Sequence, residues 1–76
     1  MNSTRSADIA EFVREVRRGL NCTQEEFAAQ LGVTFSTVNR WENSKSHPSK
    51  LAVRLLKSTA QEMDDGDRLI QKYFPS

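Results

Sequence analysis

Few side chains in this 76-residue sequence have the types and spacing that catalysis or metal binding requires. The single histidine, His47, has no nucleophile or second metal ligand at a suitable spacing. The single cysteine, Cys22, excludes an internal disulfide and a multi-cysteine metal site. Asp64, Asp65 and Asp67 lie close together, but the twelve-residue ligand pattern of an EF-hand is absent. We therefore expect no catalytic residues, no metal and no cofactor, and we do not expect an enzyme.

A second group of polar side chains lies in a segment that a helix would turn outward. Val38 and Trp41, three residues apart, would face the interior together with Val33. A short helix over about 35–42 then presents to solvent Phe35, Ser36, Thr37, Asn39 and Arg40. Because so short a helix is marginal in isolation, packing must hold it in place. Its outer face is free for another task.

The charge distribution marks the same region. The net charge of the chain is only +1, but residues 36–57 carry five basic residues against the single acidic Glu42, a net +4. The basic residues are Arg40, Lys45, Lys50, Arg54 and Lys57. Charge alone favours an ordinary solvated surface, so this pattern indicates a nucleic-acid partner only in combination with a motif.

Local signals predict two short helices joined by a tight turn between residues 23 and 43. Thr23 and Glu26 have the spacing of a capping box, which predicts that a helix begins at about residue 24. Gly32 can adopt the left-handed conformation that ends this helix, and Thr34 can cap the next one. The short connection forces a sharp angle between the two helices.

Another helix is predicted before this pair. Ser6 can cap it, and residues tolerant of positive φ, Gly19 and Asn21, place its end. Its buried face follows the i, i+3, i+4 pattern through Ile9, Phe12, Val13, Val16 and Leu20.

Two more helices are predicted after the pair. One starts at Pro48 and Ser49 and has an apolar face made of Leu51, Ala52, Leu55 and Leu56. The last is capped by Asp64 and stopped by Pro75. Its apolar residues either fill the small core or supply a dimer surface: Leu69, Ile70, Tyr73 and Phe74.

The predicted fold class is all-α, with five helices in one compact domain over residues 6–76 after a flexible N-terminus, residues 1–5. Contents of 37% hydrophobic and 28% charged residues are typical of a soluble globular domain. The sequence lacks an apolar run long enough to cross a bilayer and lacks the pattern of a signal peptide, so we expect a cytoplasmic protein without a membrane partner.

Residues 24–43 resemble the helix-turn-helix of the phage Cro and repressor family, also called the lambda-repressor-like or xenobiotic-response-element family. The residues that carry this resemblance are Thr23-Gln24-Glu25-Glu26, Ala28, Gly32, Val33, Val38 and Trp41-Glu42-Asn43. A small residue at Ala28 lets the two helices cross closely, and Val38 and Trp41 would anchor the second helix to the core. With the five predicted helices, the resemblance covers nearly the whole chain.

The resemblance implies a sequence-specific regulator of transcription, a repressor, that binds double-stranded DNA as a homodimer on a palindromic site. The helix over about 35–42 would lie in the major groove and read bases through Phe35, Ser36, Thr37, Asn39 and Arg40. Phosphate contacts would come from Thr23, Gln24, Asn43 and Lys45. An ion pair between Arg17 and Glu42 would join the first helix to the end of the third.

Two positions depart from the family pattern. Phe35 stands where a polar residue is common, and it either contacts a thymine methyl group or shields the turn. Ser44 stands where glycine is frequent, so Asn43 or Ser44 must adopt a left-handed conformation. For Arg40, a phosphate contact or a solvated surface charge remains the alternative to base readout, and for Asn39 the alternative is a solvated helix position.

Two other functions stay open at this point. The first is an antitoxin that binds a toxin protein and represses its own operon through the same motif. The second is an interaction module that keeps the fold and has lost DNA binding. Neither is separated from a repressor by the sequence.

Overall fold

The structure, a computed structural model, describes residues 6–75. Over that range it contains five α-helices and no strand, which confirms the all-α, five-helix prediction. The helices are α1 (Ser6–Gly19), α2 (Gln24–Leu31), α3 (Phe35–Glu42), α4 (Lys50–Ala60) and α5 (Gly66–Tyr73). The N-terminal segment expected to be flexible, residues 1–5, and the capping role expected of the Ser6 side chain lie outside what the structure describes.

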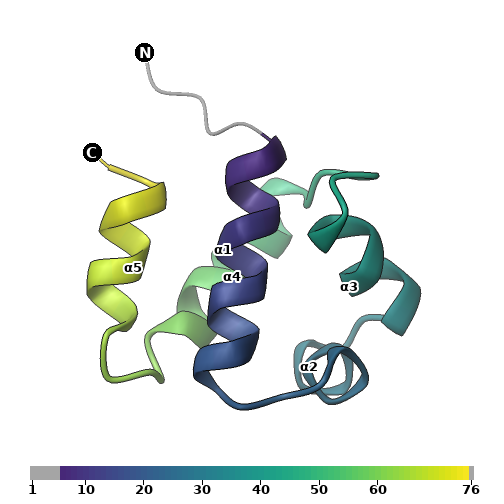
Figure 1. The fold of residues 1–76 in the computed structure, drawn as a ribbon, viewed down its shortest axis with the longest axis horizontal. Coiled ribbons are helices and arrows are strands. Elements are labelled where there is room, and N and C mark those ends of the chain that lie inside the picture. The colour runs from purple at the N-terminus through teal and green to yellow at the C-terminus, as the bar shows by residue number, and fades with distance from the viewer. Residues whose placement is uncertain (1–5, 76) are drawn as a thin grey trace.

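Helix α1 runs through the middle of the molecule, with α5 on one side and the α2–α3 pair on the other (Figure 1). Its apolar stripe is fully buried, because four residues at helical spacing face the core: Ile9, Phe12, Val13 and Val16. The helix ends where expected. Asn21 adopts the left-handed conformation, with φ of 59°, whereas Gly19 stays helical beside the side chain of Met63. The α2–α3 pair therefore packs against the core residues of α1.

Helix α4 buries only part of the face predicted for it. Leu56 and Ala60 are buried and Ala52 is half-buried, but Leu51 and Leu55 are exposed. The prediction was wrong for these two leucines because α4 is packed mainly by α1 and α5, which cover one stripe of the helix. Thr59 completes that stripe, and the two leucines lie beyond it.

Helix α5 begins one residue later than predicted. The residue before it is Asp65, not Asp64, and its side chain makes no capping hydrogen bond. Gly66 fixes this start, because a β-carbon there would lie 1.9 Å from the carbonyl oxygen of Ala60. Only a glycine permits this approach of the α5 start to the end of α4.

The apolar residues of α5 serve the core. Leu69 is buried, and the ring of Phe74 meets Phe12 edge to face at a centroid distance of 5.0 Å. Tyr73 packs on the same ring and donates a hydrogen bond to Glu15 of α1. Of the two roles left open for these residues, core packing is the one that the structure shows.

Candidate nucleic-acid interface

The α2–α3 pair is positioned by the caps that the sequence predicts. The hydroxyl of Thr23 accepts from the backbone N–H of Glu26 at 3.0 Å, and the Glu26 carboxylate accepts from the Thr23 N–H at 2.9 Å. Gly32 has φ of 77° and ends α2 in the left-handed conformation. Thr34 then caps α3 by accepting from the N–H of Thr37 at 3.1 Å. The capping box, the glycine turn and the second cap are therefore confirmed.

Apolar residues hold the two helices against each other and against α1. Phe27, Ala28 and Leu31 of α2 are buried, as are Val38 and Trp41 of α3. Because these anchors use the inner side of α3, the rest of its surface faces outward. Helix α3 is thus a short ridge on the surface of the molecule, and its inner face is fixed to the core.

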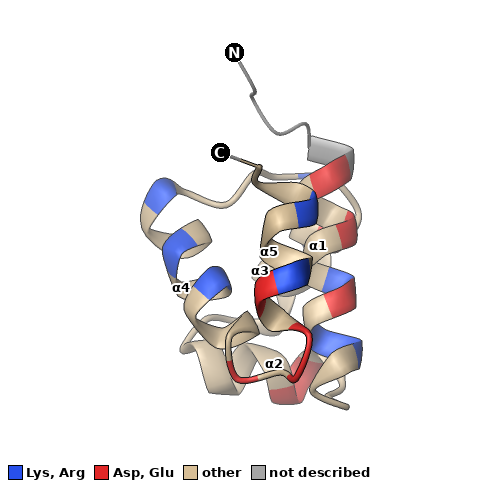
Figure 2. Cartoon of the chain, turned by 90° about the vertical axis from the view of Figure 1, so that its left-hand side faces the viewer, with Lys and Arg blue, Asp and Glu red and all other residues tan. Residues whose placement is uncertain are grey.

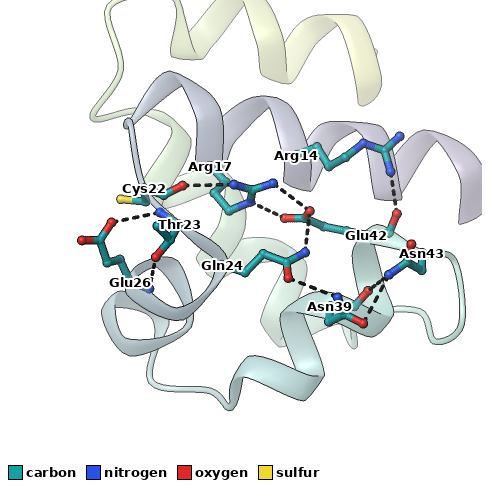
Figure 3. Close-up of polar contacts among 9 residues, drawn as sticks. All are labelled: Arg14, Arg17, Cys22, Thr23, Gln24, Glu26, Asn39, Glu42 and Asn43. Atoms are coloured by element: carbon teal, nitrogen blue, oxygen red, sulfur yellow. Dashed lines mark hydrogen bonds and ion pairs between the residues drawn. The ribbon is translucent and has the colours of Figure 1, made fainter.

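A chain of polar side chains fixes the ends of the pair (Figure 3). The guanidinium of Arg17 on α1 donates to both carboxylate oxygens of Glu42, from Nε at 2.6 Å and from Nη2 at 3.0 Å. Glu42 is only 4% exposed and Arg17 is 16% exposed, so this ion pair is largely removed from water. The hydrogen bond with Glu42 raises the pKa of Arg17 above its ordinary value. The pair holds α1 to the end of α3.

Gln24 continues this chain toward the outer side of α3. Its amide nitrogen donates to Glu42 at 2.9 Å, and its amide oxygen accepts from the Asn39 side chain at 3.1 Å. Asn43 in turn donates to the backbone carbonyl of Asn39 at 2.8 Å and to its side-chain oxygen at 3.3 Å. Sequence reasoning assigned Gln24, Asn39 and Asn43 to DNA and missed that they bind one another. The i, i+4 spacing of the two asparagines was the available signal.

Arg14 was also missed. Its guanidinium donates to the backbone carbonyl of Glu42 at 2.5 Å, and this carbonyl belongs to the last turn of α3, where helix carbonyls lack an intrahelical partner. Arg14 lies one turn before Arg17 on α1, so both arginines reach the same helix end. That spacing could have suggested the contact.

The five candidate base-reading residues share the outward side of α3 but differ in how free their side chains are. Phe35 is 47% exposed, and Ser36 and Arg40 are exposed. The Arg40 side chain makes no hydrogen bond or ion pair with any residue among 6–75. Thr37 is half-buried with its hydroxyl against that of Thr34 at 2.9 Å, and Asn39 is half-buried and bonded as described. The exposed members of this set are therefore Phe35, Ser36 and Arg40.

The candidate phosphate-binding residues lie near the C-terminal half of this ridge, where Gln24 contacts Glu42 and Asn39, and Asn43 contacts Asn39. Thr23 and Gln24 lie at the start of α2, near the positive end of the helix dipole, and Glu25 and Glu26 add two carboxylates to the same turn. Asn43 and Lys45 lie just after α3, and both are exposed. Ser44 between them takes the left-handed conformation, with φ of 58°, where the family often has glycine. The backbone of this loop is held by a hydrogen bond from the Lys45 N–H to the Arg40 carbonyl at 2.8 Å.

The surface charge near α3 is more positive than the sequence alone suggests. Glu42, the one acidic residue of the basic segment, is buried and neutralised by Arg17. The segment's basic side chains are thus opposed by no exposed carboxylate of their own segment, and α4 carries basic residues without acidic ones (Figure 2). This arrangement suits a polyanion.

Other kinds of site find little support in the described residues. Over residues 6–75, no group of three or more His, Cys, Asp or Glu side chains is arranged to hold a metal ion. None of the five helices is long and apolar enough to cross a membrane.

Comparison with known proteins bears on the same segment. The helix-turn-helix family matches residues 13–56, more than half of the chain. Among curated proteins, the chain is similar to the HTH-type transcriptional activator BcrR of Enterococcus faecalis, at 31% identity over 64 residues. That alignment covers 79% of this chain and 31% of the relative, so the chain spans about a third of the relative's length. No solved structure matches the chain significantly.

Proposed function

The chain belongs to the helix-turn-helix family of the Cro and repressor type, and on that basis we propose that it is a sequence-specific regulator of transcription that binds double-stranded DNA. Helix α3 would enter the major groove, which is wide enough for a helix and displays a distinct pattern of donors and acceptors for each base pair. The observation that carries this proposal is a set of exposed residues on the outward side of α3, Phe35, Ser36 and Arg40, on a helix fixed by its caps and by Glu42.

Within this site, Arg40 has the chemistry for direct readout, because its free guanidinium can donate two hydrogen bonds to one guanine. Ser36 and Thr37 offer hydroxyls, and Phe35 offers an apolar contact to a thymine methyl group. Asn39 lies in the same surface, with its amide bonded to Gln24. Phosphate contacts from Thr23, Gln24, Asn43 and Lys45 would set the orientation of the ridge.

The finer form of the proposal is a repressor that acts as a homodimer on a palindrome, with half-sites about 34 Å apart. A repressor can act by occupying a promoter, which needs only DNA binding. A second copy would raise the affinity of so small a module and lengthen the DNA site that it recognises. Part of the apolar side of α5 packs on α1, and Ile70, Tyr73 and Phe74 are half-buried there. Because its ligand is DNA and its single cysteine needs no oxidising compartment, we propose that the protein is cytoplasmic.

Selection of bound sequences from a random DNA pool, followed by gel-shift titration at moderate salt, tests this function. We expect one preferred site, and two-fold symmetry of that site would support the dimer. Binding without any sequence preference, or no binding, would overturn the proposal. The antitoxin alternative predicts a small toxin gene next to this one and co-purification of the two proteins. If they do not co-purify, that alternative is removed.

A further inference from the structure

The outer side of α4 exposes two leucines that the fold does not use. Leu51 is 72% exposed and Leu55, one turn later, is 41% exposed. Residues four apart lie on the same face of a helix, so the two side chains form one apolar strip. Among the described residues the remaining large apolar side chain with comparable exposure is Phe35, which belongs to the candidate DNA surface.

Basic residues lie beside this strip, and they line a hollow that neither leucine lines. Lys50 and Arg54 are exposed on the adjoining side of α4, and no acidic residue occurs between His47 and Ala60. A hollow of about 670 Å³ lies along the same side, lined by His47, Pro48, Lys50, Val53, Arg54 and Lys57. Figure 2 shows that α4 carries blue segments and no red one. A partner for this surface must therefore supply both apolar and acidic groups.

This combination decides between three possible occupants. A second copy of the chain would place the basic side of one α4 against that of the other, and like charges facing each other oppose association. DNA phosphates would satisfy Lys50 and Arg54 but would leave Leu51 and Leu55 in water. An amphipathic helix with carboxylates beside its apolar stripe satisfies both parts of the surface.

We propose that the outer side of α4 binds an acidic amphipathic helix of a partner protein. Leu51 and Leu55 pack against the partner's apolar residues, while Lys50 and Arg54 pair with its carboxylates. The small area makes the contact weak and rapidly reversible. The leucine strip lies on α4, whereas the candidate base-reading residues lie on α3.

The test is an NMR titration of the full chain, labelled with ¹⁵N, using a synthetic amphipathic helix of leucine, alanine and glutamate as the probe. We expect shift changes that concentrate in α4 and weaken with added salt. A matched peptide with lysine in place of glutamate should give none. Leu51→Ser combined with Leu55→Ser should weaken binding by about tenfold or more, an effect of about 1.4 kcal/mol. These positions are exposed, so the variant should keep its fold and its affinity for DNA.

A charge-matched pair of variants sharpens the result. Arg54→Glu should abolish the shift changes, whereas Arg68→Glu, at an exposed position on α5, should leave them. The proposal is overturned if the peptide causes no shifts at millimolar concentration, or if the lysine peptide binds equally. It is also overturned if the leucine variant dissociates a dimer of the wild type, which assigns the face to a second copy. A tenfold loss of DNA affinity in that variant would assign the face to DNA and would equally overturn it.

Discussion

Gln24, the first residue of α2, accepts a hydrogen bond of 3.1 Å from the side-chain amide of Asn39, in the middle of α3. The same glutamine donates to Glu42, which is bound by Arg17 of α1. The outer side of α3 is therefore connected through three side chains to the central helix. The first helix of the pair orients the second by a specific polar contact in addition to apolar packing.

This contact predicts how a substitution at Asn39 changes DNA binding. Asn39→Ala removes an orienting hydrogen bond, so affinity should fall by a similar factor for every sequence. Fluorescence anisotropy with a set of single-base variants of the selected site measures this. If the variant instead loses its preference for adenine at one position, Asn39 reads that base directly and its bond to Gln24 is given up in the complex.

The Arg17–Glu42 pair predicts a large loss of stability when one partner is removed. Glu42→Leu leaves the largely buried Arg17 guanidinium without its carboxylate, and we expect a loss of about 3–5 kcal/mol. Urea unfolding of the variant measures the loss. The double variant Arg17→Met with Glu42→Leu is the matched control, and it should be more stable than Glu42→Leu alone. A single-variant loss below about 1 kcal/mol would place this pair among weak surface ion pairs.

Two glycines should respond differently to the same substitution. Gly32→Ala meets no atom within 4 Å, so its cost is the left-handed backbone alone, about 1 kcal/mol. Gly66→Ala would place its β-carbon 1.9 Å from the Ala60 carbonyl oxygen, so the backbone must shift, at a cost of up to about 3 kcal/mol. Thermal unfolding should rank Gly66→Ala as the less stable variant. Gly32→Asn should lose less than Gly32→Ala, and the reverse order would contradict the role of φ.

The surroundings of Tyr73 predict how the stability of the fold changes at alkaline pH. Burial, and then the hydrogen bond to Glu15, raise the pKa of its phenol above the ordinary value. Because the pKa is higher in the folded than in the unfolded chain, the stabilisation is complete below about pH 10 and is lost as pH rises further. The chain has one tyrosine, so tyrosinate absorbance reports this group alone.

The absorbance titration should have its midpoint above the ordinary value of about 10. The free energy of unfolding should fall above that pH in the wild type and fall less steeply in Tyr73→Phe. A midpoint at or below the ordinary value would show that α5 does not shield this phenol.

The sequence predicted those parts of the fold that depend on local chemistry. Thr23, Glu26, Gly32 and Thr34 each act through neighbours within a few residues, so their roles could be predicted from spacing alone. Leu51 and Leu55 could not be placed, because their exposure depends on which side of α4 is covered by helices remote in sequence.

The candidate site shows the same division. That Phe35, Ser36, Thr37, Asn39 and Arg40 share the outward side followed from the inward spacing of Val38 and Trp41. The bond between Gln24 and Asn39 did not follow, since it joins residues fifteen apart in sequence and depends on how the two helices cross. Asp64 failed as a cap for a related reason, because the start of α5 is set by the approach of Gly66 to Ala60.

The most direct test of the central claim, that α3 reads DNA, compares the DNA affinity of Arg40→Ala with that of Arg68→Ala. Both arginines are exposed and both changes remove one positive charge, but Arg40 lies on α3 and Arg68 on α5. Anisotropy on the selected site should show that Arg40→Ala loses about 1–3 kcal/mol and accepts other base pairs at one position. Arg68→Ala should bind like the wild type. Equal affinities for the two variants, with base preference unchanged in both, would contradict the claim.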